Sequence, residues 1–407
     1  MFNILKLKNI SKNIGSGITP LRSNSRFWEN GTVYWLKTEQ LGEHQIYETS
    51  EKISQYAIEE TSIKIFPKNT LSIAMYGEGR TRGNVSILKA EMTTNQACCN
   101  IVIDNKKADY EYVYYFLKTQ YINLRSLSSG VRKNLNSNDI KEFEIRLPNI
   151  QTQQKIAKVL SDFDAKIELN NKINDNLEQM AKTLYDYWFV QFDFPNANRK
   201  PYKTSGGKMV WNEELKREIP VGWEVGELKD IANITMGQSP PGESYNEEGN
   251  GMIFYQGCTD YGNRFPTIRK YTTSPTRFAK QGDILLSVRA PVGTLNISKE
   301  DCCIGRGLAC MNSKNDSITY LFGVMVNLKQ IFDRRNVSGT TFGSITKDDL
   351  FSLPVIIPNE KTVKAFQNLV FSSFEKQNKI ELENIELASL RDWLLPMLMN
   401  GQVKIQD

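Results

Sequence analysis

Five short segments of this 407-residue chain combine glycine or serine with Arg, Lys, Thr or Asn side chains. They are residues 79–84, 128–134, 287–291, 305–307 and 338–343. Glycine lets a backbone approach a ligand, Arg and Lys bind phosphate, and Arg, Asn or Gln can pair with a base edge. A solvated turn is the more common explanation for any one segment, but together they favour contact with DNA. The candidate DNA-binding residues are Arg80, Arg82, Asn84, Arg132, Lys133, Asn134, Arg289, Arg306, Thr340 and Thr341.

No group of residues in the sequence is typical of a catalytic or metal site. The chain has no Gly-x4-Gly-Lys-Ser/Thr phosphate loop and no Asn/Asp-Pro-Pro-aromatic motif of amino-methyltransferases. No good helix follows the glycine-rich segment 77–83, so a surface hairpin loop explains it better than nucleotide binding. His44 is the only histidine, which argues against Ser-His-Asp and zinc-hydrolase chemistry. Asp162 and Asp164 lie two apart on a predicted helix, so we expect diverging surface charges rather than an acid–base pair.

The composition is that of an ordinary globular protein with two or more domains: 40% of the residues are hydrophobic and 24% charged. A net charge of +5 permits an anionic partner without requiring one. No apolar run approaches the roughly 18 residues of a membrane span, and the first residues do not form a signal peptide. The adjacent pairs Cys98-Cys99 and Cys302-Cys303 favour buried thiols over disulfides. These features predict a cytoplasmic protein without a membrane partner.

The element that must position the candidate loops is a helix repeated within the chain. Residues 151–190 carry apolar side chains at spacings of three and four without Pro or Gly, which predicts one coiled-coil helix about 60 Å long. Adding 210 to each number gives 361–401, where the same pattern recurs and Asn384 takes the place of Asn174. These two Asn could face one another, or one or both could be solvated. The helix-pairing residues we expect are Leu160, Phe163, Ile167, Asn174, Leu177, Leu184, Trp188, Phe366, Val370, Asn384, Leu387, Leu394 and Leu398.

The segments ahead of the helices also repeat, with an offset that drifts from 221 to 210. Gly17–Pro20 matches Gly237–Pro240, and Asn95–Cys98 matches Gly307–Cys310. Each copy mixes predicted strands (70–74, 100–103, 144–147; 283–288, 354–357) with a short predicted helix (110–118; 318–328), so each domain is α+β with a β-rich core. The predicted organisation is a domain at 1–150, a helix at 151–195, a polar linker at 196–221, a domain at 222–358, a helix at 359–401 and a tail at 402–407.

This order of parts resembles the specificity subunit of type I restriction–modification systems. The resemblance covers essentially the whole chain and is carried by Leu147-Pro148, Gln153–Leu160, Trp188–Phe192, Ile219–Glu224 and Leu394–Gly401. Two departures are visible. The first copy lacks the Ile-Pro-x-Gly-Trp lead-in of the second, and Gln153-Gln154 becomes Val363-Lys364 in the second helix.

The resemblance implies two similar β-rich target-recognition domains separated by two long antiparallel coiled-coil helices, with an internal pseudo-two-fold repeat. It implies a non-catalytic subunit that recognises a bipartite site in double-stranded DNA, one half-site for each domain. Two methyltransferase subunits carrying S-adenosylmethionine would methylate adenine, and ATP-dependent restriction subunits could join them. No cofactor would be bound by this chain itself. The alternative is a duplicated coiled-coil scaffold without sequence-specific DNA binding, which predicts apolar patches in place of the polar loops.

Overall fold

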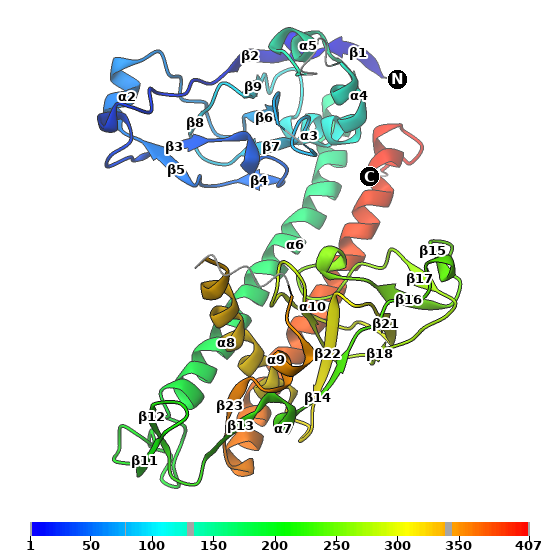
Figure 1. The fold of residues 1–407 in the computed structure, drawn as a ribbon. Coiled ribbons are helices and arrows are strands. Elements are labelled where there is room, and N and C mark those ends of the chain that lie inside the picture. Colours follow the sequence, from blue (N-terminus) through cyan, green and yellow to red (C-terminus); the bar gives the residue numbers. More distant parts are fainter. Residues whose placement is uncertain (1, 78, 128–133, 338–343, 406–407) are drawn as a thin grey trace. The chain divides into compact units, whose positions relative to one another are not determined.

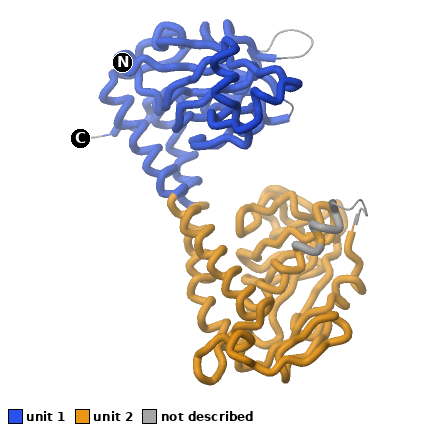
Figure 2. Tube along the Cα trace, turned by 90° about the vertical axis from the view of Figure 1, so that its left-hand side faces the viewer, with its two compact units in different colours: residues 1–168, 386–407 blue, residues 169–385 orange. Residues whose placement is uncertain are grey.

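The computed structural model describes residues 2–77, 79–127, 134–337 and 344–405. The chain forms two compact units, which Figure 2 shows in different colours. Unit 1 contains residues 1–168 and 386–407, and unit 2 contains residues 169–385. Two long helices, α6 (Ile150–Tyr185) and α10 (Glu360–Met399), contribute residues to both units. A π-helical turn, η3 (Asp186–Val190), extends α6.

Unit 1 is built on two small sheets (Figure 1). A five-stranded sheet has the order β2 (Ser11–Ser16), β9 (Cys98–Ile103), β6 (Leu71–Ala74), β7 (Val85–Leu88) and β4 (Gln45–Ile46). A three-stranded sheet has the order β5 (Glu51–Ile53), β3 (Val33–Leu36) and β8 (Thr93–Thr94), and β1 (Asn3–Lys6) pairs with β10 (Glu144–Leu147). The helices are α1 (Leu7–Ile10), α2 (Gln55–Glu60), α3 (Tyr110–Thr119), α4 (Tyr121–Ser126) and α5 (Ser137–Glu142), with 3-10 turns at Ser25–Phe27 and Thr38–Gln40.

Unit 2 repeats this plan with four strands in one sheet and five in the other. One sheet has the order β14 (Ala232–Met236), β22 (Leu308–Ser313), β19 (Ile284–Ser287) and β20 (Leu295–Ile297). Another has the order β15 (Tyr245–Asn246), β17 (Tyr271–Thr272), β16 (Met252–Tyr255), β21 (Cys302–Ile304) and β18 (Phe278–Ala279). Two further strand pairs are β11 (Met209–Asn212) with β12 (Arg217–Pro220) and β13 (Glu224–Glu227) with β23 (Pro354–Ile357). The helices of this unit besides α6 and α10 are α7 (Leu228–Ile231), α8 (Ile318–Val337) and α9 (Lys347–Phe351). Two 3-10 turns lie at Gly242–Ser244 and Cys258–Asp260.

Each unit has one large apolar core that joins a sheet, a helix and part of α10. In unit 1 the strands β6 and β9 pack against α3, and Leu395 and Leu398 of α10 complete the core. In unit 2 the strands β19 and β22 pack against α8, and Phe366 and Val370 of α10 complete the core. The long helices therefore bury their apolar stripes largely against the domains as well as against each other, which explains why neither could be stable alone.

The repeated Pro-Asn that precedes each long helix is a helix cap. The side-chain oxygen of Asn149 accepts a 2.8 Å hydrogen bond from the backbone N–H of Thr152, and that of Asn359 accepts a 2.9 Å bond from Thr362. Asn is among the preferred residues at this position because its oxygen satisfies an amide that has no partner within the helix. The repeat at these positions therefore marks where both helices begin.

The residues expected to pair the helices are all at least partly buried. Leu160, Trp188, Phe366, Val370, Asn384 and Leu398 are buried, and Phe163, Ile167, Asn174, Leu177, Leu184, Leu387 and Leu394 are half-buried. Within unit 2, the Asn384 amide accepts a 2.8 Å hydrogen bond from Asn170 and donates a 2.9 Å bond to Asn171. Asn384 thus contacts neighbours of Asn174 rather than Asn174 itself, whose backbone carbonyl accepts a 3.2 Å bond from Gln377.

The strands and short helices predicted from the pattern are present, with two differences of extent. Helix α8 continues to Val337, beyond the predicted end at residue 328. The segment 196–221, predicted to be a polar linker, contains the hairpin β11–β12. Aromatic packing orders it, because Phe194 stacks on Tyr202 and Trp223 with ring centroids 4.6 and 4.8 Å apart. Among the described residues, no helix has the length and apolar character needed to cross a membrane.

Candidate nucleic-acid interface

A short turn at the end of a sheet is built in the same way in both units. In unit 1, the backbone N–H of Ile18 donates to Thr94 O at 2.9 Å, and that of Asn95 donates to Leu36 O at 2.9 Å. In unit 2, Gln238 N–H donates to Ile304 O at 3.0 Å, and Gly305 N–H donates to Tyr255 O at 2.8 Å. These matching bonds make residues 94–97 the structural equivalent of residues 304–307.

This equivalence corrects the alignment suggested by the sequence. Asn95 corresponds to Gly305, two residues earlier than the predicted match at Gly307. The shared Ala-Cys pairs at 97–98 and 309–310 caused the error, because both pairs are buried and many small apolar residues fit such positions. Hydrogen-bond partners on distant strands define the register, and the linear sequence does not contain them.

The repeated Gly-x-Thr/Ser-Pro motif is explained by its contact with this turn. A Cβ atom on Gly17 would lie 1.9 Å from Thr94 O, and one on Gly237 would lie 2.2 Å from Gly305 O. Only glycine allows the two backbones to approach so closely. The hydroxyl two residues later supports the turn in both copies: Thr19 donates to the side-chain oxygen of Gln96, and the Ser239 hydroxyl accepts from the Arg306 N–H at 3.3 Å.

Two further segments meet the turn in each unit. Met75 N–H donates to Ala97 O at 2.8 Å and Leu135 N–H to Met75 O at 3.1 Å. In the second copy, Val288 N–H donates to Gly307 O at 2.9 Å and Ile345 N–H to Val288 O at 2.8 Å. Tyr76 is therefore equivalent to Arg289, and Asn134 to Ser344, which forms a bridge with Arg289. Of the candidate segments, 287–291 and 305–307 therefore belong to the site of unit 2, and Asn134, the described end of 128–134, belongs to the site of unit 1. Segment 338–343 lies outside the described residues.

The segment 79–84 is held in place by α4. Arg125 Nη1 donates to Gly79 O at 2.9 Å and to Arg82 O at 3.3 Å, while the Tyr121 hydroxyl donates to Arg80 O at 2.7 Å. The Asn84 amide donates to Leu41 O at 3.1 Å. Asn84 thus has a structural contact, whereas the backbone bonds fix the loop and leave the Arg80 side chain exposed.

The structure describes six of the ten candidate DNA-binding residues. Arg80, Arg289 and Arg306 are exposed, and Arg82, Asn84 and Asn134 are half-buried. Arg132, Lys133, Thr340 and Thr341 lie outside the described residues. The sequence did not identify Gln96, which is exposed at the position equivalent to Arg306. The signal that could have found it is the Thr/Ser in the glycine motif, whose hydroxyl contacts this position in both copies.

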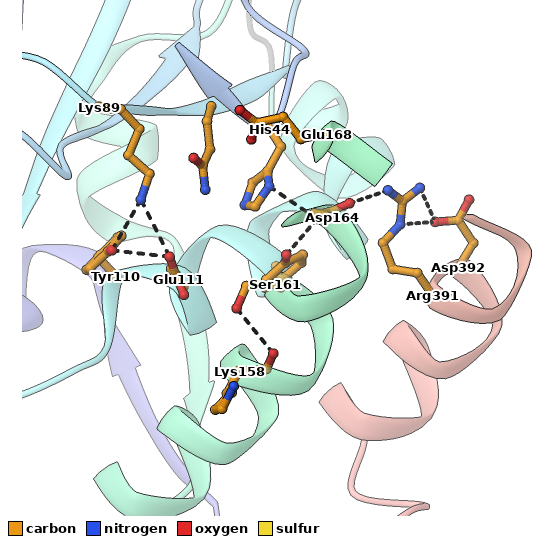
Figure 3. Close-up of polar contacts among 12 residues, drawn as sticks. His44, Lys89, Tyr110, Glu111, Lys158, Ser161, Asp164, Glu168, Arg391 and Asp392 are labelled. Carbon is orange, nitrogen blue, oxygen red and sulfur yellow. Dashed lines mark hydrogen bonds and ion pairs between the residues drawn. The ribbon is translucent and has the colours of Figure 1, made fainter. Parts of the chain in front are cut away.

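A second polar site in unit 1 is a buried ionic cluster around Asp164 (Figure 3). Asp164 accepts a 2.6 Å hydrogen bond from the Tyr115 hydroxyl and a further bond from Arg391, and His44 Nδ1 lies 3.3 Å from its carboxylate. Asp164 is only 7% exposed, so the expectation that it is a surface charge is wrong. Asp162 is exposed as expected and pairs with Lys158 at 2.8 Å.

Electrostatics in this cluster favour a structural role over acid–base chemistry. Burial lowers the pKa of His44, although Asp164 opposes this effect, so the imidazole tends to be neutral. The carboxylate is already engaged by a hydroxyl and a guanidinium, and it connects α3, α6 and α10 with the segment before β4. In the described ranges, no group of three or more His, Cys, Asp or Glu is arranged to hold a metal ion.

The fold and the loop sites together define a duplicated recognition protein, with two α+β domains that share long helices and present polar loops at one sheet end. The model of the type I restriction modification DNA specificity domain matches residues 2–179 and 220–387, and the chain belongs to this family. It is a DNA-specificity protein and not an enzyme, so the resemblance is confirmed and the scaffold alternative is set aside.

Individual relatives agree with this assignment. The type I restriction enzyme MjaIX specificity subunit of Methanocaldococcus jannaschii is 29% identical over all of this chain and 94% of its own length. The putative MjaX specificity subunit of the same organism is 33% identical over 74% of this chain and 70% of its own. The crystal structure of a type I S subunit from M. genitalium has the same fold, with a TM-score of 0.62, 19% identity and coverage of 98% and 96%.

Proposed function

We propose that this chain recognises a bipartite site in double-stranded DNA, with one half-site for each domain. The observation that carries the proposal is the pair of equivalent loop sites with different side chains. Gln96 and Tyr76 in unit 1 occupy the positions of Arg306 and Arg289 in unit 2. The side chains that contact base edges determine which DNA sequence a protein binds. Two sites with the same backbone structure and different side chains would therefore select two different sequences.

The catalytic steps would belong to partner subunits. Two methyltransferase subunits carrying S-adenosylmethionine would methylate adenine at the site, and ATP-dependent restriction subunits could join the complex. The names of the relatives, specificity subunits of type I restriction enzymes, support this arrangement. A net charge of +5 is compatible with partners that supply part of the phosphate contact.

A reducing cytoplasm is the proposed compartment. All six cysteines are free, and five of them are buried. Burial raises the pKa of Cys98 to about 12 and that of Cys302 to about 11, so these thiols would be poor nucleophiles. They pack as small apolar side chains.

The test is to express the full chain with its cognate methyltransferase subunit and to map methylated adenines across the host genome. We expect one motif made of two short sequences separated by an unspecified spacer. A strain with the methyltransferase but without this chain is the control and should lack the motif. A single contiguous motif, or the same motif in the control strain, would overturn the proposal.

Two measurements on the purified chain complement the genome map. The chain alone should incorporate no labelled methyl group into DNA. Its affinity for duplex DNA should fall as salt rises, with a slope of about 0.9 per phosphate contact on a logarithmic plot. Binding that is insensitive to salt would argue against a DNA interface.

A further inference from the structure

We propose that Gln96 and Arg306 determine the base preference at corresponding positions of the two half-sites, and that Lys64 and Arg277 beside them contact phosphate. The inference rests on the proposed function, which does not itself say which residues select bases. It predicts adenine opposite Gln96 and guanine opposite Arg306. The argument depends on structural equivalence, exposure and side-chain chemistry.

The equivalence of Gln96 and Arg306 is fixed by the hydrogen bonds around them. The residues on either side are bound in the same way in both copies: Asn95 and Gly305 donate to β3 and β16, and Ala97 and Gly307 accept from the strand-end residues Met75 and Val288. The Thr19 and Ser239 hydroxyls contact position 96 or 306 itself. Both side chains are exposed at the tip of a turn whose backbone is held from three directions.

A second pair of equivalent residues lies beside this turn. In unit 1 the antiparallel bridge between Phe66 and Met92 sets a register that places Lys64 across from Thr94. In unit 2, Ala279 pairs with Cys302 and Phe278 with Cys303, and Ile304 N–H donates to Arg277 O at 2.9 Å. Arg277 is therefore the equivalent of Lys64. Both are exposed cations, one strand away from the turn.

The side-chain charge is the same in both units at one pair of positions and different at the other pair. Positions 64 and 277 keep a positive charge, which suits the phosphate backbone because every DNA sequence has it. Positions 96 and 306 differ in charge and in hydrogen-bonding pattern, which suits a base edge. A Gln amide matches the N6 and N7 of adenine, and an Arg guanidinium matches the O6 and N7 of guanine. In unit 1, Thr19 donates to the Gln96 oxygen and so orients the amide.

The experiment exchanges the two side chains in the full complex of chain and methyltransferase. Methylation is measured on a duplex library in which both half-sites are randomised. Arg306→Gln should change the preference from guanine to adenine at one position of the second half-site, by about 5- to 150-fold, and leave the first half-site unchanged. Gln96→Arg should produce the reciprocal change in the first half-site. Arg306→Ala should remove the preference at the same position.

Matched controls are Lys64→Gln and Arg277→Gln, which also remove an exposed cation next to the turn. They should weaken binding equally for all library members and reduce the salt slope by about 1. The inference is overturned if Arg306→Gln and Arg306→Ala both keep the wild-type preference at every position, or if the controls change it instead. A wild-type complex without a bipartite preference would show that the proposed function itself is wrong.

Discussion

The Tyr115 hydroxyl on α3 donates a 2.6 Å hydrogen bond to the buried carboxylate of Asp164 on α6. The same carboxylate accepts from Arg391 of α10 and faces His44 of the loop before β4. One charged group therefore connects four segments of unit 1 that are far apart in sequence. Removing one partner of a buried ion pair destabilises a protein more than replacing both partners by apolar residues does. The charge that remains is still desolvated but has lost its counter-charge.

Asp164→Asn should lower the free energy of unfolding by about 3–5 kcal/mol, because it leaves the Arg391 guanidinium, whose side chain is 15% exposed, without its buried counter-charge. Urea unfolding measures the change. Asp162→Asn, the same substitution two residues away in an exposed pair with Lys158, should change it by less than about 0.5 kcal/mol. Equal effects of the two variants would argue against a structural role for the cluster.

Stability should depend on the protonation of His44. Burial lowers its pKa below the ordinary 6.5; Lys118 and Lys89 act in the same direction, and Asp164 and Glu111 oppose them. The unfolded chain then binds the proton more tightly than the folded one, so stability is complete above about pH 6.5 and falls as the pH decreases towards the folded pKa. Since the chain has no other histidine, His44→Gln should flatten this part of the stability profile. Identical profiles for variant and wild type would contradict the assignment.

The Asn384 layer of the helix pair should show energetic coupling. Asn384→Leu should destabilise unit 2 by about 1–3 kcal/mol, because Asn170, 1% exposed, loses its amide partner. The double variant Asn170→Leu/Asn384→Leu should be less destabilised than the sum of the singles, with a coupling of at least about 0.5 kcal/mol. Asn368→Leu, an exposed site on the same helix, is the control and should be nearly neutral. If the destabilisation of the double variant equals the sum of the two single variants, Asn170 and Asn384 do not interact.

Arg125→Ala should release the loop 79–84 without removing any exposed cation of that loop. Hydrogen bonds from a charged group are worth about 1.5–3 kcal/mol, so we expect at least about a tenfold loss of affinity for the first half-site. The second half-site should be unaffected. Methylation of the two half-site libraries by the assembled complex measures both. Asn123→Ala, which removes an exposed side chain of α4 that donates a 2.7 Å bond to Gln120, three residues earlier, should have no effect.

The features predictable from sequence are those set by local pattern. The periodic apolar residues of 151–190 and 361–401 specify α6 and α10, because burial on one face imposes a period. The short runs at 71–74 and 284–287, which are buried at every position, specify strands of a sheet covered on both faces. Asp164 was misjudged and Gln96 was missed for a common reason. Their partners, Arg391 and Thr19, are 227 and 77 residues away in sequence, and only the tertiary fold brings them together.

The composition of unit 1 has a consequence for biosynthesis. Its core includes Leu395 and Leu398 together with Leu7 and Leu71, whereas unit 2 is one continuous stretch, residues 169–385. On the ribosome, the N-terminal domain emerges first, but the residues that complete its core are translated only after all of unit 2. Unit 2 can fold from residues already made, while the earlier domain keeps apolar surface exposed until α10 arrives. The domain translated first is therefore the one that finishes folding last, and it is the one that a chaperone would need to protect.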